Sequence, residues 1–147
     1  MAEDTNDLRV RLVTPDRILF EGTAETVELP GLTGYMATRF GSAPLMTELG
    51  AGDVTIRGIP DDPSGETRYN VNWGFAEVLP DRVTILASDA LKPEEIDVQR
   101  AEQQLDRGLQ MWKKAQDHPS PEAFAEAQRV ISEAKAKLAS AGEGEKD

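Results

Sequence analysis

Few residues in this chain of 147 residues are suited to covalent or acid–base chemistry. His118 is the one histidine, and there is no cysteine. His118 stands between Asp117 and Pro119 in a turn-like segment, where a general-base role is not expected. Ser42 and Ser88 have no obvious base, so a nucleophile–histidine–acid triad has little to draw on. We therefore expect no catalytic residue.

Signals for metal and nucleotide sites are equally sparse. The absence of cysteine excludes disulfides and cysteine-ligated metal sites. No P-loop is present, and no Gly-x-Gly-x-x-Gly opens a helix. Asp61, Asp62 and Glu66 are calcium-type ligands, but their spacing does not match an EF-hand loop. We expect a solvated loop tip there and no metal site.

The charge is strongly acidic, with a formal net value of −11. Residues 1–90 carry 15 acidic and 7 basic residues, so most of the excess lies there. Such a surface repels nucleic acid and anionic lipid, although it also fits a simple solubility role. No apolar run approaches the roughly 20 residues of a membrane-spanning helix, and the acidic start is unlike a secretory signal. We expect no nucleic-acid binding and no direct membrane insertion.

The first part of the chain has the pattern of a β-sandwich or barrel. Leu8, Val10 and Leu12 alternate with Arg9 and Arg11, as in a half-buried strand. Further short strands are expected over residues 18–21, 25–29, 54–57, 67–73, 75–79 and 82–87, separated by turns rich in Gly, Pro and Asp.

The second part has the pattern of two helices joined at residues 118–121. Pro93 suits a first helical turn, and Ser120 suits the N-cap of the second helix. Narrow stripes of apolar or small residues recur at steps of three and four: Val98, Ala101, Leu105, Gly108, Trp112 and Ala115, then Phe124, Ala127, Ile131, Ala134 and Leu138. Because alanine buries little area, we predict a weakly held hairpin that can open.

The predicted fold class is α+β. A β-sandwich over residues 8–89 precedes an antiparallel helical hairpin over residues 90–141, with flexible tails at 1–7 and 142–147. The segment from Gly31 to Leu45 is rich in glycine, yet it carries Tyr35, Met36 and Phe40. Such a loop is either folded onto the core or used for docking.

Five stretches together resemble the epsilon subunit family of F-type ATP synthase, the counterpart of the mitochondrial delta subunit. They are Phe20-Glu21-Gly22, Val27-Glu28-Leu29-Pro30-Gly31, Gly41-Ser42-Ala43-Pro44-Leu45, Gly74-Phe75-Ala76-Glu77-Val78 and Val83-Thr84-Ile85-Leu86-Ala87. The family commonly has Gly-His-Ala-Pro-Leu at the third stretch, and Gly-Gly where this chain has Trp73-Gly74.

The resemblance implies a ten-stranded β-sandwich followed by two helices, and a non-catalytic rotor subunit of a proton-translocating ATP synthase. The sandwich would grip the gamma subunit and the polar loops of the c-ring at the cytoplasmic face of the bacterial inner membrane. The Gly31–Pro44 loop would face the ring, with contacts from Leu32, Tyr35, Arg39, Phe40 and Ser42. Plain packing under the loop is the alternative for Phe40.

Some family members bind ATP through an I/L-D-x-x-R-A motif, which Ile96, Asp97, Arg100 and Ala101 match, with Arg107 at a further basic position. The second-helix arginines of those members are absent over residues 132–138. Regulatory ATP therefore competes with a simpler interpretation, in which Asp97 stabilises a helix N-terminus. No other cofactor is implied.

The family's C-terminal helices inhibit ATP hydrolysis through the catalytic alpha and beta subunits. Residues 121–141 hold three basic residues against three glutamates, so we expect weak inhibition at most, which deletion of residues 91–147 would test. The competing hypothesis is a β-sandwich ligand-binding module with a helical oligomerisation tail.

Overall fold

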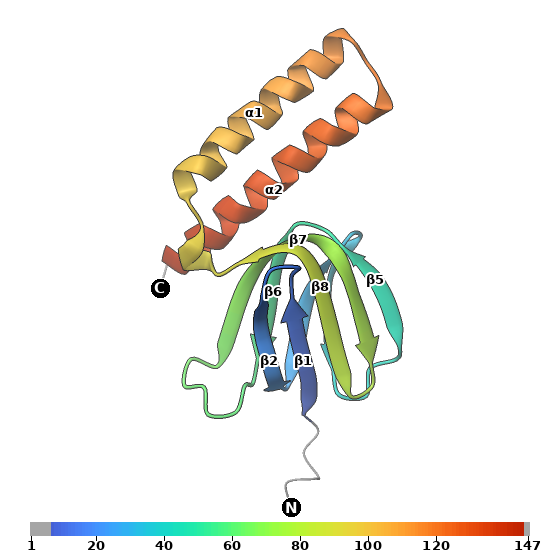
Figure 1. The fold of residues 1–147 in the computed structure, drawn as a ribbon, viewed down its shortest axis with the longest axis vertical. Coiled ribbons are helices and arrows are strands. Elements are labelled where there is room, and N and C mark those ends of the chain that lie inside the picture. Colours follow the sequence, from blue (N-terminus) through green and yellow to red (C-terminus); the bar gives the residue numbers. More distant parts are fainter. Residues whose placement is uncertain (1–6, 146–147) are drawn as a thin grey trace, which may run out of the picture. The chain divides into compact units, whose positions relative to one another are not determined.

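The structure is a computed structural model that describes residues 7–145. The chain divides into two compact units, residues 1–91 and 92–147, and each is described by itself. The first unit is built of strands and the second of helices (Figure 1).

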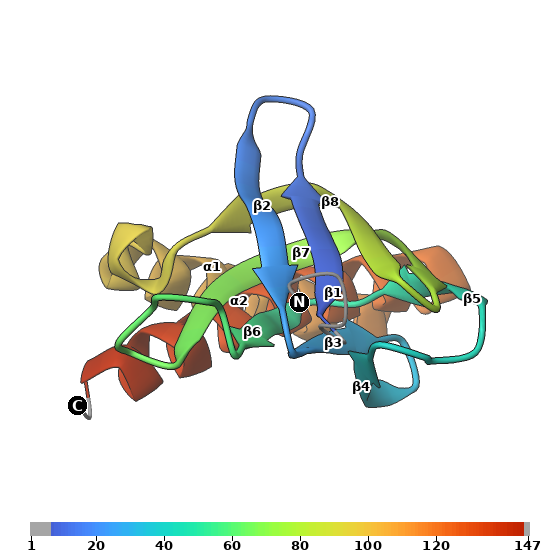
Figure 2. The same ribbon diagram turned by 90° about the horizontal axis from the view of Figure 1, so that it is seen from below.

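Eight strands make up the described part of the first unit. They are β1 (Leu8–Val13), β2 (Ile18–Ala24), β3 (Thr26–Gly31), β4 (Gly34–Arg39), β5 (Leu45–Leu49), β6 (Gly52–Arg57), β7 (Glu66–Leu79) and β8 (Arg82–Leu91). The strand order is β2-β1-β8-β7-β5-β3-β4, and β6 pairs with β3 and β7. Only β1 and β8 pair in parallel among the strand pairs of residues 7–145, and Figure 2 shows β1 between β2 and β8.

The inward side chains of these strands form one hydrophobic core. The alternation predicted for β1 is confirmed, because Leu8, Val10 and Leu12 are buried while Arg9 and Arg11 are exposed. The other strands contribute large buried side chains, among them Leu29, Leu49, Val54, Ile56, Val71, Val78, Val83 and Ile85. The core therefore fixes which side chains of each strand face outward.

Three features of the strand unit differ from the sequence predictions. Strand β5 (Leu45–Leu49) was not predicted. The Gly31–Pro44 segment is not a single loop, because Gly34–Arg39 pairs with β3 as strand β4. The strands expected at 67–73 and 75–79 are one strand, β7. Trp73 and Gly74 have positive φ angles, 48° and 132°, which redirect β7 without ending it. This merging contributes to a count of eight described strands where the resemblance implied ten.

The second unit is an antiparallel helical hairpin of α1 (Val98–Asp117) and α2 (Pro121–Glu145), which lie side by side in Figure 1. The prediction of a helix beginning at Pro93 was wrong. Pro93–Glu95 is a 3₁₀ helix, and α1 begins only after its N-cap Asp97. The N-cap role of Ser120 is confirmed, since its Oγ accepts a hydrogen bond of 3.1 Å from the Ala123 backbone N–H.

The hairpin interface uses small residues, as the stripes predicted. Ala101, Gly108 and Ala115 of α1 are buried, as are Ala127, Ile131 and Ala134 of α2. Near the turn, the rings of Trp112 and Phe124 meet edge to face with centroids 4.9 Å apart. Val98 and Trp112, also placed in the stripe, are 37% and 36% exposed and lie at its margin.

Helix α2 extends to Glu145, beyond the hairpin end predicted at residue 141. Gly142 favours an earlier end because glycine costs about 1 kcal/mol relative to alanine inside a helix. The helix nevertheless continues through Gly142, and Ser140 just before it is buried. The remaining parts of the predicted tails, residues 1–6 and 146–147, lie outside the described residues.

Candidate interaction surface

The outer face of the sheet carries a row of large apolar side chains that the core does not need. Phe75 and Leu86 are direct partners across β7 and β8, and each is 52% exposed. Leu86 also pairs with Val13 on β1, and Val13 pairs with Ile18 on β2, which is 54% exposed. We call Ile18, Val13, Leu86 and Phe75 the apolar row. Its length across four strands makes it a continuous surface feature.

A shallow groove of about 380 Å³ follows the middle of the apolar row. Its lining is mostly apolar and small: Val13, Thr14, Pro15, Gly74, Phe75, Leu86, Ala87 and Ser88. Outward positions of a solvated sheet are normally polar, and contiguous apolar patches on a surface mark interaction sites. The geometry therefore fits a docking surface for another protein.

This surface was not predicted from the sequence, although the strand pattern contained a sign of it. In the stretch Phe75 to Leu79 the inward positions are Ala76 and Val78, which leaves Phe75 facing outward. In the same way, Val83, Ile85 and Ala87 face the core and leave Leu86 outside. Apolar residues on both faces of a period-two pattern were the recognisable sign.

The five predicted c-ring contacts fall into two groups at opposite ends of β4. Leu32 and Tyr35 lie at the β3–β4 turn, whereas Arg39, Phe40 and Ser42 lie where β4 ends. At roughly 3.4 Å per residue, the five steps from Tyr35 to Phe40 span about 17 Å. The structure does not bring the five residues together into one cluster.

The first group is exposed but anchored. Leu32 is 55% exposed and Tyr35 59% exposed. The Tyr35 hydroxyl accepts a hydrogen bond of 3.1 Å from the backbone N–H of Asp53. A Cβ at Gly52 would lie 2.6 Å from that hydroxyl, so glycine makes room for the ring. The Tyr35 hydroxyl is therefore held in place as an acceptor, while the residue stays largely exposed.

The second group is a tight turn that holds Phe40 outward. The Arg39 backbone N–H donates to Ser42 Oγ at 3.0 Å, and the Ser42 N–H donates back to the Arg39 carbonyl at 3.0 Å. Gly41, at φ 91°, donates to the Pro80 carbonyl at 2.7 Å and ties this turn to the β7–β8 turn. Phe40 is 43% exposed and is not part of the buried core.

The residues that match the ATP-binding motif have clear structural roles at the start of α1. Asp97 Oδ1 accepts a hydrogen bond of 3.2 Å from the Arg100 backbone N–H, which caps the helix. Ile96 and Ala101 are buried, whereas Arg100 and Arg107 are exposed. Capping and burial alone account for Ile96, Asp97 and Ala101.

A carboxylate also lies against the face of α1 that carries Arg100 and Arg107. Arg100, Gln104 and Arg107 share one face of α1, because residues four and seven apart align on a helix. Gln104 Nε2 donates to Glu133 Oε2 at 3.2 Å, and Glu133 also pairs with Arg129 at 3.8 Å. A negative charge at this place opposes a phosphate group.

The acidic loop between β6 and β7 is internally satisfied. The Ser64 hydroxyl and backbone N–H donate to Asp62 Oδ1 at 2.7 and 2.9 Å. These hydrogen bonds, chiefly that of the hydroxyl, hold the pKa of the Asp62 carboxyl below its ordinary value. Within the described part of the chain, no three His, Asp or Glu residues are grouped to hold a metal ion.

Comparisons with known proteins agree with this architecture. The family described as ATP synthase, Delta/Epsilon chain, beta-sandwich domain matches residues 7–102, which covers the strand unit and the start of α1. The chain is 36% identical over 135 residues to the ATP synthase epsilon chain of Moorella thermoacetica, covering 92% of this chain and 96% of that one. It is 48% identical over 102 residues to that of Koribacter versatilis, covering 67% of each.

A solved structure shares the fold. A chain in the cryo-EM structure of Euglena gracilis mitochondrial ATP synthase, OSCP/F1/c-ring, superposes with a TM-score of 0.72 at 17% identity, covering 92% of this chain and 81% of that one. The α+β class, with a β-sandwich followed by two helices, is confirmed. The matched strand unit and the relatives that span nearly the whole length lead to one conclusion: the chain belongs to the ATP synthase delta/epsilon chain family.

Proposed function

We propose that this chain is a non-catalytic central-stalk subunit of an F-type ATP synthase, and that the apolar row seats it on the gamma subunit. Its relatives are named ATP synthase epsilon chain, which favours a stalk role over a ligand-binding module with a helical oligomerisation tail. The single observation that carries the gamma contact is the row of Ile18, Val13, Leu86 and Phe75 on the outer sheet face.

The size and chemistry of the row support a protein partner. Phe75, Leu86 and Ile18 are each more than half exposed, and they lie on strands whose inner faces are already filled by the core. Burial of a large apolar side chain contributes roughly 1.5–3 kcal/mol. A few such residues at the centre of an interface therefore supply much of the binding energy.

Contact with the c-ring polar loops fits the outer side of β4. Tyr35, Ala37 and Arg39 are exposed at alternate positions of this strand, which lies at one end of the sheet order. Leu32 and Phe40 extend the same surface at its two ends. In this arrangement β4 lies along the ring, so one partner surface can contact the predicted residues at both ends of the strand.

The helical hairpin would contribute at most weak regulation of ATP hydrolysis through the alpha and beta subunits. Its second helix carries as many basic as acidic residues over 121–141. Regulatory ATP binding by Arg100 and Arg107 is a separate hypothesis. The motif can be explained without ATP, because Asp97 caps the helix.

The expected location is the cytoplasmic face of a bacterial inner membrane, peripheral to a proton-translocating complex. Among residues 7–145, neither helix combines the length and the apolar character required to cross a membrane. Attachment to the membrane would then come from the c-ring contact.

The test is assembly with a gamma-containing catalytic core that lacks its own epsilon subunit. We expect the wild-type chain to co-elute with the core, and Phe75→Ser with Leu86→Ser to weaken binding by at least about tenfold, since two exposed apolar anchors are lost. Thr67→Ser, a small change on the other part of β7, is the matched control. Equal binding by the double variant would contradict the gamma contact.

A further inference from the structure

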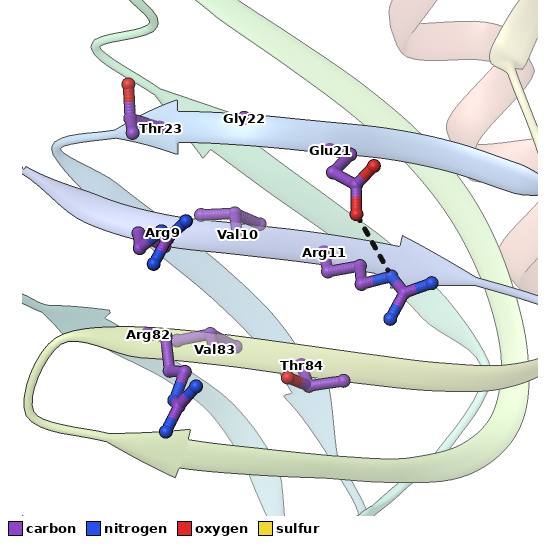
Figure 3. A pocket seen from close by; sticks show the side chains of 9 residues that line it. All are labelled: Arg9, Val10, Arg11, Glu21, Gly22, Thr23, Arg82, Val83 and Thr84. Atoms are coloured by element: carbon purple, nitrogen blue, oxygen red, sulfur yellow. Dashed lines mark ion pairs between the residues drawn. The ribbon is translucent and has the colours of Figure 1, made fainter.

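A second groove on the outer sheet face is lined by three arginines. It has a volume of about 450 Å³ and lies over β2, β1 and β8 (Figure 3). Arg9 and Arg11 come from β1 and Arg82 from β8, while Glu21, Gly22 and Thr23 of β2 form the opposite side. We call the groove lined by Arg9, Arg11 and Arg82 the arginine groove.

The arginines are not fully compensated within the subunit. Arg9 and Arg82 are direct partners in the β1–β8 register, and like charges in that position are destabilising. Arg11 pairs with Glu21 at 3.2 Å, and Arg82 meets Asp81 at 3.8 Å, with all four side chains more than half exposed. Arg9 makes no ion pair with any residue of the described range 7–145. Two carboxylates therefore face three guanidinium groups.

This concentration of positive charge runs against the character of the chain. Residues 1–90 contain 7 basic residues against 15 acidic ones, and all seven are arginine. Three of the seven line this one groove. A cluster of positive charges on an acidic unit, placed where it destabilises strand pairing, is expected where a surface binds a partner.

The arginine groove continues directly from the apolar row. Arg9, Arg11 and Val13 occupy alternate positions of β1, and Arg82, Thr84 and Leu86 occupy alternate positions of β8. Both sets face outward, so a protein seated on Val13 and Leu86 meets the arginines about 7–14 Å further along the same strands. One partner can cover both surfaces.

We propose that the arginine groove receives an acidic segment of the subunit that docks on the apolar row. Guanidinium groups bind carboxylates bidentately, and their planar geometry fits extended Asp or Glu side chains. The segment would neutralise the Arg9–Arg82 pair and fix the rotational register of the sheet on its partner. This inference rests on the proposed gamma contact, and it adds a polar determinant to it.

The experiment measures binding of the full chain to the gamma-containing core from about 50 to about 300 mM NaCl, a range over which exposed charges become screened. Arg9→Gln with Arg82→Gln removes the charge of Arg9, which forms no ion pair within residues 7–145, and the charge of its strand partner Arg82, and each glutamine keeps a polar side chain. Arg57→Gln is the control, because Arg57 is an exposed arginine of β6 that pairs with Glu66 outside the groove.

The groove variant should bind about tenfold more weakly than wild type at low salt, and the difference should shrink at high salt, as for charge-assisted contacts. Arg57→Gln should bind like wild type. Wild-type binding with an unaffected groove variant overturns this inference alone. No wild-type binding at all overturns the proposed function and this inference with it.

A lipid occupant is tested with the chain alone and phosphatidylglycerol vesicles. No vesicle binding is expected from a subunit of net charge −11. Vesicle binding that the Arg9→Gln and Arg82→Gln changes abolish would assign the groove to anionic lipid and overturn the carboxylate partner.

Discussion

At the scale of single residues, Trp73 and Gly74 mark the point at which the long strand β7 changes the strand it pairs with. Before this point β7 pairs with β6, and after it β7 pairs with β5. Trp73 adopts φ 48°, a left-handed conformation that costs a non-glycine residue roughly 1–2 kcal/mol. The glycine common in the family at this position would remove that cost, so the departure noted in the sequence has a defined physical consequence.

Gly74 has no substitute at its position. At φ 132° a side chain is strained, and a Cβ would collide with the Leu86 carbonyl oxygen. We expect Gly74→Ala to lower the free energy of unfolding by about 3 kcal/mol or more. Gly65→Ala, at φ 80° with open space around it, should cost only about 1 kcal/mol. Urea unfolding followed by circular dichroism measures both, and equal losses would contradict the steric argument.

Asp97 is predicted to act as a helix cap. Asp97→Ala should lower hairpin stability by about 1 kcal/mol, because the Arg100 backbone N–H loses its acceptor. Asp106→Ala, which removes an exposed carboxylate within α1, is the matched control and should change stability by less than about 0.5 kcal/mol. Thermal unfolding monitored at the helical circular dichroism band separates the two, and a neutral Asp97→Ala would refute the cap.

The same geometry predicts the outcome of a nucleotide titration. With Asp97 committed to the cap and the Glu133 carboxylate bonded to Gln104 on the face of α1 that carries Arg100 and Arg107, we expect no saturable ATP binding by calorimetry. Saturable binding that Arg100→Ala abolishes would contradict this prediction and support the regulatory-ATP hypothesis.

At the scale of elements, local pattern predicted the alternating strands and the helical stripes well. The residues buried in β1 and along α1 and α2 followed from periodicity and small-residue spacing, and Ser120 was identified as a cap from its type alone. Elements whose form depends on tertiary pairing were missed. Strand β4 exists because it pairs with β3, and the glycines at 31 and 34 gave no sign of it beyond a turn.

The candidate site was missed for the same reason, because the apolar row is formed by strand pairing. Phe75 and Leu86 could be placed outward from their own strands, but Val13 joins them through a parallel pairing between residues 73 positions apart. The family motif pointed to residues 32–42 on and beside β4, whereas the sheet register aligns the exposed apolar residues on β2, β1, β8 and β7.

Gly108 controls how closely the two helices approach. A Cβ there would lie 2.8 Å from Ile131 Cγ1 and 3.2 Å from the Ile131 backbone nitrogen. We expect Gly108→Ala to destabilise the hairpin by about 1–2 kcal/mol despite its better helix propensity. The same change at Gly142, where nothing lies within 4 Å, should stabilise α2 by up to about 1 kcal/mol. Thermal unfolding should therefore shift in opposite directions, and shifts of the same sign would contradict the close contact.

At the scale of the whole molecule, the chain divides after Leu91 into the strand unit, for which we propose docking, and the helical unit, for which we propose weak regulation. Deletion of residues 92–147 keeps β8 complete and should leave binding to the core intact. Because the second helix has no net positive charge over 121–141, we expect ATP hydrolysis by the complex to rise less than about twofold. A several-fold rise would show that the hairpin inhibits strongly.

The most direct test of the docking surface uses the absence of cysteine from the chain. Ser88→Cys, in the groove of the apolar row, is labelled with a photoactivatable cross-linker on the isolated chain and activated after assembly of the complex, and Ser64→Cys at the β6–β7 loop serves as the control. We expect a cross-link from position 88 to the gamma subunit and none from position 64. No gamma product from position 88, or equal products from both positions, would contradict it.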